Sequence, residues 1–136
     1  MLSRVSRLPR TAFALVVVVV FATVAAVATA KVWSHLRSAT VTVQNGSLPP
    51  PYGRAHVHRY TTRAAVAKVT RALNANHIAS RPPTPSGPCT GGFNLTVKLV
   101  GRTTQTLTAY ECGGHNYGGI AGNVNGFLSA LGIAAP

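Results

Sequence analysis

FNLTVKL, at residues 93–99, alternates strictly between apolar and polar side chains. In a β-strand successive side chains point to opposite faces, so the apolar residues from Phe93 to Leu99 should face a core while the polar ones face water. The alternation therefore predicts one half-buried strand, and the rest of the chain can be placed around it.

A hairpin is expected immediately after this strand. Gly101-Arg102 predicts a turn, and residues 103–112 are expected to return as an antiparallel partner rich in Thr and Tyr. A two-residue turn would place Cys89 within about two residues of lying opposite Cys112. The same register would turn Tyr110 and Cys112 inward but Leu107 and Ala109 outward, so we expect a bulge or a longer loop.

Helices are predicted on both sides of the hairpin in the sequence. From residue 63 to about residue 75, Val66, Val69 and Leu73 share one stripe while the basic residues fall on the opposite half, and Thr61 or Thr62 offers an N-cap. Near the C-terminus a second stripe has i, i+3, i+4 and i+7 spacing, and it is followed by Gly132 as a candidate cap. This stripe consists of Val124, Phe127, Leu128 and Leu131.

A brief strand at residues 56–60 and a short irregular strand in the glycine-rich segment 113–122 complete the expected elements. The predicted fold class is α+β, a small antiparallel sheet covered on one face by an amphipathic helix that precedes it and a short C-terminal helix. No G-x-G-x-x-G spacing occurs among these glycines, so no phosphate-binding loop and no cofactor are expected.

The N-terminus predicts export. Residues 1–10 carry three arginines and no acid, and residues 12–30 form an apolar run, so residues 1–30 are expected to be a signal peptide or a signal anchor. Ala28-Thr29-Ala30 favours cleavage after Ala30, whereas the length of the run favours a membrane helix over residues 11–30. In both cases the rest of the chain is expected outside the cytoplasm.

The exported part divides into two regions by composition. Residues 31–54, which contain Pro49-Pro50-Pro51, predict a stiff linker, with Trp33 outside the core. Residues 55–136 are expected to form the small extracytoplasmic α+β domain.

Cys89 and Cys112 are the only cysteines, and both lie in the part predicted to be exported. A disulfide between them would close a loop of about 24 residues. The resulting loss of entropy in the unfolded chain corresponds to a stabilisation of roughly 3.5 kcal/mol. We expect this disulfide to supply a large share of the stability of a small domain.

Charge sets limits on function. The chain has 13 Lys and Arg residues against a single acid, Glu111, so any mechanism that needs two carboxylates in one chain is excluded. The cations between residues 54 and 81 predict a positive surface, and we assign polyanion binding to them as a hypothesis. They are Arg54, Arg59, Arg63, Lys68, Arg71 and Arg81.

Outside the cytoplasm the matching polyanions are anionic lipid head groups, acidic wall polymers or extracellular DNA. Sequence-specific nucleic-acid binding is not expected, because no recognition-helix or zinc-finger pattern occurs. The alternative to polyanion binding is that basic charge merely keeps an exported protein soluble.

Two groups of residues suggest chemistry, and each has a simpler interpretation. A Ser-His-acid triad would have to recruit Glu111, and no serine lies in a nucleophile-elbow pattern, so the sequence predicts a protein that is not an enzyme. His56 and His58 would share one face of a strand and are weak metal candidates, with His77 or His115 as a third ligand. Solvated surface histidines are the simpler interpretation, and no metal is expected.

A second class of function stays open from the sequence. A small disulfide-stapled inhibitor or accessory subunit would present a rigid loop, such as residues 80–88 or 113–119, to another exported protein whose identity the sequence does not give.

The order of these features resembles that of small, exported, largely uncharacterised two-cysteine α+β proteins of high-GC soil bacteria. The resemblance covers about residues 58–133 and rests on the amphipathic helix, the proline-rich loop into Cys89, the alternating strand and Cys112 after the second strand. This chain departs from the pattern after Cys89, where Thr90-Gly91-Gly92 stands in place of a proline and an acid. The resemblance implies a fold and an extracytoplasmic location but no activity.

Overall fold

The computed structural model describes residues 33, 35–46, 53–85, 87 and 89–136. The predicted signal peptide or anchor, residues 1–30, lies outside the described residues. Within the described part of the chain, neither helix has the length and apolar character needed to cross a bilayer.

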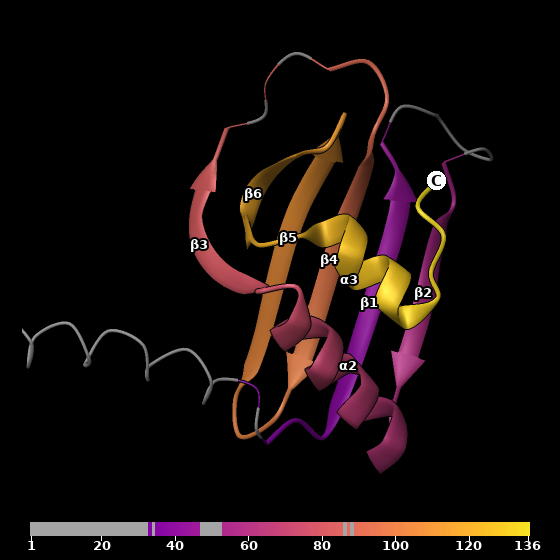
Figure 1. The fold of residues 1–136 in the computed structure, drawn as a ribbon, viewed down its shortest axis with the longest axis vertical. Helices are drawn as coiled ribbons and strands as arrows, with labels where there is room; N and C mark the ends of the chain where they lie inside the picture. Colours follow the sequence, from indigo (N-terminus) through magenta and orange to yellow (C-terminus); the bar gives the residue numbers. More distant parts are fainter. Residues whose placement is uncertain (1–32, 34, 47–52, 86, 88) are drawn as a thin grey trace, which may run out of the picture. The chain divides into compact units, whose positions relative to one another are not determined.

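The described residues form one six-stranded antiparallel sheet and two helices, which confirms the α+β class (Figure 1). The order of strands across the sheet is β2-β1-β4-β5-β6-β3. In chain order the elements are β1 (Ser38–Asn45), β2 (Ala55–Tyr60), α2 (Arg63–Ala75), β3 (Ala79–Thr84), β4 (Phe93–Val100), β5 (Thr104–Cys112), β6 (His115–Ala121) and α3 (Val124–Leu131).

Side-chain chemistry explains where both helices begin and where α3 ends. The Thr62 side chain accepts a hydrogen bond from the backbone N–H of Ala65 and caps α2, and Asn123 caps α3 in the same way through Gly126. α3 ends at Gly132, whose φ of 77° is the left-handed conformation that glycine adopts without strain. The two helices lie on the same side of the sheet (Figure 1).

The loop between β4 and β5 resolves the register conflict that the sequence raised. Val100 pairs with Thr104, so the loop contains three residues, 101–103, instead of two. One additional residue moves every β5 side chain to the opposite face. Leu107 and Ala109 consequently face the core opposite Val97 and Leu95.

The prediction that residues 31–54 form a linker was wrong for β1. This strand lies inside the sheet, paired with β2 on one side and β4 on the other, and its Ala39, Val41 and Val43 are buried. Trp33, which was expected outside the core, is 5% exposed and belongs to the core cluster. The compact unit therefore begins at Trp33 and not at residue 55.

The two segments with unusual composition are strands at one edge of the sheet. Residues 79–84 form the outermost strand β3 although they contain Pro82 and Pro83, and the pairing register shifts between Ser80 and Thr84. An edge strand tolerates prolines because one row of its N–H groups has no partner strand. The loop that we expected at residues 80–88 is therefore shorter.

The glycine-rich segment forms β6, joined to β5 by the two-residue turn Gly113-Gly114. The φ angles of 59° and 82° at these positions are both positive, as a type I′ hairpin turn requires.

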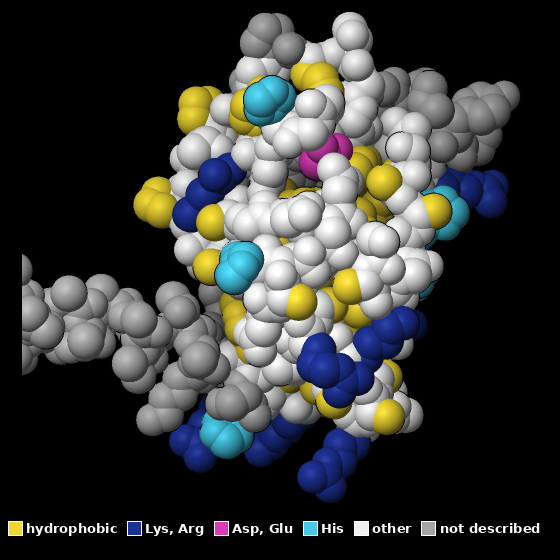
Figure 2. Space-filling model, viewed as in Figure 1, with side chains coloured by type: hydrophobic (Ala, Val, Ile, Leu, Met, Phe, Trp, Pro, Cys, Tyr) yellow, Lys and Arg dark blue, Asp and Glu magenta, His cyan; other side chains and the backbone are white. Residues whose placement is uncertain are grey.

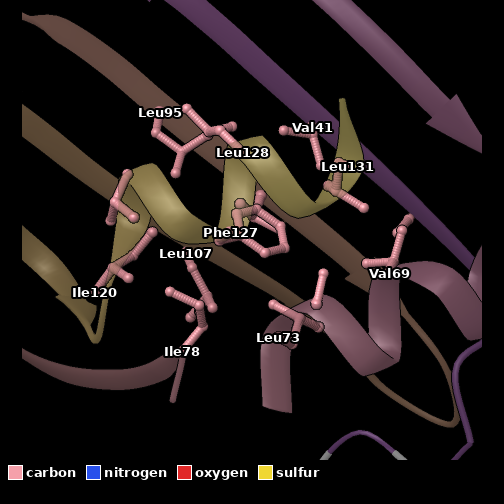
Figure 3. Close-up of a cluster of buried hydrophobic side chains, with 14 of the residues drawn as sticks. Val41, Val69, Leu73, Ile78, Leu95, Leu107, Ile120, Phe127, Leu128 and Leu131 are labelled. Carbon is pink, nitrogen blue, oxygen red and sulfur yellow. The ribbon is translucent and has the colours of Figure 1, made fainter. Parts of the chain in front are cut away.

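The core lies between the helices and the covered face of the sheet (Figure 3). Phe127 is the largest fully buried side chain, and it lies in a layer with Leu107 of β5 and Leu73 of α2. Two apolar helix stripes and the alternating strands thus bury one continuous cluster.

Cys89 and Cys112 form the predicted disulfide, with their Cα atoms 6.5 Å apart. Cys112 ends β5, and Cys89 lies in the loop that leads into β4. The bond ties this loop to the middle of the sheet.

Candidate functional site

The sheet has a second face, opposite the helices, which we call the open face. Cross-strand pairing sorts its side chains into rows that run across the strands, and we name three of these rows by their side chains. The cation row contains Arg59, Thr40, Lys98 and Thr106. The hydroxyl row contains Thr42, Thr96 and Thr108, and the aromatic row contains Gln44, Asn94, Tyr110 and Tyr117.

The spacing of the rows follows from strand geometry. Neighbouring strands lie about 4.8 Å apart, and side chains two residues apart on one strand are separated by about 6.7 Å. Arg59 and Lys98, on either side of Thr40, are therefore about 10 Å apart at their backbones. Lys98 and Asn94, four residues apart on β4, place the cation row about 13 Å from the aromatic row.

The structure does not gather the six predicted cations into one patch. β2 and β3 are opposite edges of the sheet, so Arg81 is separated from Arg54 and Arg59 by four strands. Arg63, Lys68 and Arg71 lie on α2, whereas Arg59 lies on the open face. Closeness in sequence was a poor guide because the chain crosses from one edge of the sheet to the other between β2 and β3.

Two of these cations are engaged in the fold itself. The Lys68 ammonium donates to the Leu131 carbonyl at 3.1 Å, where a cation is favourable at the C-terminal end of α3. The Arg81 guanidinium donates through Nε to the Gly118 carbonyl at 3.1 Å and through Nη2 to Thr84 Oγ1 at 3.2 Å. These bonds hold β3 to β6 where the register shifts.

Sequence reasoning missed three exposed cations. Lys98 stands in the cation row, and Arg37 and Arg102 lie beside the same end of the sheet, because Arg37 N–H donates to the Val100 carbonyl and Arg102 is in the adjoining loop. The alternation at residues 93–99 already placed Lys98 on the open face, but Arg59, the other cation of its row, comes from a segment about 40 residues earlier. Figure 2 shows that Lys and Arg also spread over the helix side, mainly in its lower half.

Glu111, the only acid of the chain, is 7% exposed. Its Oε1 accepts from the Gly114 backbone N–H at 2.8 Å and from Asn125 Nδ2 at 3.1 Å. The carboxylate thus braces the β5–β6 turn against the first turn of α3. The surface formed by the described residues consequently carries no Asp or Glu side chain that is more than slightly exposed.

Replacing Glu111 by leucine is expected to lower the free energy of unfolding by about 1–3 kcal/mol, because both donors lose their acceptor. Glu111→Gln retains an Oε1 acceptor and should cost less than about 1 kcal/mol. Urea denaturation followed by circular dichroism measures both values. Equal losses in the two variants would contradict the assigned role of the carboxylate oxygen.

The histidines do not assemble into a metal site. His56 and His58 share one face of β2, as predicted, but His115 starts β6, on the other side of β1, β4 and β5. Among the residues that the structure describes, no three His, Cys, Asp or Glu side chains lie close enough to hold a metal ion.

A hollow of about 270 Å³ opens on the open face at the aromatic row. Asn94, Thr108, Tyr110 and Tyr117 line it, together with Thr84 from the edge strand β3. No charged side chain of the described residues lines this hollow. Tyr110 and Tyr117 are directly opposite each other on β5 and β6, and both line the hollow.

No protein-family model, curated protein or solved structure matches the chain. The resemblance to small exported two-cysteine proteins therefore stays a prediction.

Proposed function

We propose that the protein is an exported, non-catalytic module that binds acidic polymers of the cell envelope through the open face of its sheet. The observation that carries this proposal is the charge balance of the surface. The chain has 13 Lys and Arg residues and one acid, and that acid is buried in the fold. A surface with so many cations and no exposed carboxylate side chain attracts polyanions.

The cation row concentrates this charge in a place that a polymer can reach. Arg59 and Lys98 are both exposed, and their backbones lie about 10 Å apart, close to the screening length of about 8 Å at physiological ionic strength. Their potentials therefore overlap. Thr40 and Thr106, in the same row, add hydroxyl groups that hydrogen-bond to carboxylate or phosphate oxygens.

Two further features support an extracytoplasmic address. The Cys89–Cys112 disulfide is typical of an oxidising compartment. The sequence of residues 1–30 is that of an export signal or anchor, which would place the open face beside anionic lipid head groups and acidic wall polymers.

Inorganic polyphosphate is a suitable probe for this proposal because it offers anionic charge alone. Exchanging both Arg59 and Lys98 for glutamine in the full chain is expected to weaken binding at least about tenfold. The slope of log affinity against log salt should fall by about 2, because two cations no longer displace counterions. Isothermal titration at several salt concentrations measures both quantities.

The matched control changes Arg63 and Arg71 to glutamine, which removes the same charge from α2 on the covered side of the sheet. We expect this variant to bind polyphosphate within about threefold of the wild type, since only the long-range field changes. Equal weakening in the two double variants would mean that net charge, and not the open face, determines binding.

A further inference from the structure

The hollow at the aromatic row has the chemistry of a site for a neutral, hydroxyl-rich group. The Asn94 amide and the Thr108 and Tyr117 hydroxyls each offer both hydrogen-bond donors and acceptors. The rings of Tyr110 and Tyr117 supply apolar surface beside them. A sugar ring matches this combination, because its hydroxyl groups donate and accept while its C–H groups form apolar faces.

The size of the hollow fits a single ring better than a larger ligand. Its volume of about 270 Å³ is just below the roughly 300–1,000 Å³ of pockets that enclose drug-sized molecules. It is open to solvent, so a ring seated in it can be one unit of a longer polymer.

The Tyr110 side of the site is held in place by the fold. The Tyr110 hydroxyl donates to the Gly91 carbonyl, in the loop that begins at Cys89. Gly46 packs against the same ring so closely that an added Cβ would lie 2.9 Å from Tyr110 Cε2. Because this ring is fixed before a ligand arrives, binding does not have to order it.

Tyr117 is placed in a similar way. An added Cβ at Gly87 would lie 3.3 Å from Tyr117 Oη, and the His115 ring lies 6.4 Å from the Tyr117 ring between centroids. Thr84 closes the neighbouring side, where its hydroxyl accepts from the Gly118 N–H at 3.1 Å. Tyr110 is thus held by a hydrogen bond and close packing, whereas Tyr117 is positioned by packing against its neighbours.

We propose that this hollow binds one sugar ring of an anionic polysaccharide, such as a wall glycan that carries carboxylate groups. The inference rests on the proposed function, because the cation row on the same face supplies the charge that complements the anionic groups. The two rows are about 13 Å apart along β4, so one extended chain can contact both. The hydroxyl row of Thr42, Thr96 and Thr108 lies between them and offers further hydrogen bonds.

Two probes separate the hollow from the cation row. Polygalacturonate has one carboxylate on each sugar ring, whereas inorganic polyphosphate is anionic but has no sugar. In the full chain, Tyr117→Ala is expected to weaken polygalacturonate binding about tenfold, since an aromatic side chain in a binding hollow is a typical hot spot. Binding of polyphosphate should stay within about twofold, which also shows that the variant is folded.

Asn94→Ala provides a second variant at an exposed position, with an expected loss of about fivefold for polygalacturonate alone. Asn74→Ala is the matched control, because it makes the same exchange at an exposed position of α2, away from the hollow. The affinity of this variant for each probe should stay within about twofold of the wild-type value. The Arg59→Gln, Lys98→Gln double variant should weaken both probes.

The outcomes distinguish the two proposals. If polyphosphate binds but Tyr117→Ala and Asn94→Ala leave polygalacturonate unchanged, the sugar site is refuted while the polyanion function stands. If neither probe binds the wild type, both proposals fall. If Tyr117→Ala weakens an oligo(dT) probe more than polygalacturonate, the tyrosines stack bases and the assignment to sugars is overturned.

Discussion

Replacing Phe127 by alanine is expected to lower the free energy of unfolding by about 3–5 kcal/mol, the largest effect of any substitution considered for this protein. Phe127 is 0% exposed and is the largest of the fully buried side chains. Figure 3 shows its ring on α3, among apolar side chains of α2 and the sheet. Alanine would remove the ring and leave a cavity that these side chains can fill only in part.

Urea denaturation measures this loss, and two companion variants make the result interpretable. Phe127→Leu retains most of the volume and should cost about 1–2 kcal/mol, so it reports on packing even if the alanine variant does not fold. Ser129→Ala, at an exposed position on the same helix, should change stability by less than about 0.5 kcal/mol. A loss below about 1 kcal/mol for Phe127→Ala would contradict the position of α3 in the core.

Removing the disulfide with the double substitution Cys89→Ala, Cys112→Ala is expected to lower the free energy of unfolding by about 3.5 kcal/mol. The cysteines are 23 residues apart, and the unfolded chain regains the entropy of that loop when the bond is absent. Equilibrium denaturation of the double variant and of the wild type gives the difference directly.

Reduction of the wild type provides the control for this second prediction. A reducing agent should destabilise the wild type by a similar amount and leave the double variant unchanged. A loss below about 1 kcal/mol in both comparisons would show that the loop from Cys89 to β4 is already ordered in the unfolded ensemble.

The local pattern of apolar residues was sufficient to predict the elements in which these residues recur with a clear strand or helix period. The alternation at residues 93–99 predicts β4, and the stripes of Val66, Val69 and Leu73 and of Phe127 and its neighbours predict the two helices. The conflict between Tyr110 and Leu107 also predicted a bulge or a longer loop, and the structure has the longer loop, because a shift of one residue reverses the two faces of a strand. These are properties of a few consecutive residues.

The strands that the sequence failed to predict, β1 and β3, depend on pairing partners that are far away in the chain. Residues 39–43 also alternate between apolar and polar side chains, but the prolines at 49–51 favoured a linker. β1 is identified as an interior strand only by its pairing with β4, about 55 residues later in the chain. β3 contains two prolines, which argue against a strand unless the segment lies at an edge. Position within the sheet is not encoded in either segment alone.

The candidate site was the hardest part to predict because it is made by register. Lys98 and Arg59 meet across Thr40, and Asn94, Tyr110 and Tyr117 meet across three strands. The sequence predicted that the cations of residues 54–81 form one positive surface. In the fold this segment includes β2 and β3, which lie at opposite edges of the sheet, so its cations are separated. Only the order of the strands shows which side chains share a row.

The interior position of β1 in the sheet also constrains how the chain can fold while it is being synthesised. β1 and β2 can form a hairpin as soon as residue 60 emerges, but the other edge of β1 has to wait for β4, and the core has to wait for the ring of Phe127. The nascent sheet exposes an unpaired hydrogen-bonding edge of β1 until β4 has been synthesised, and an uncovered apolar face until α3 follows. A chain that ended before α3 would therefore be a substrate for chaperones and proteases, not a smaller version of the same protein.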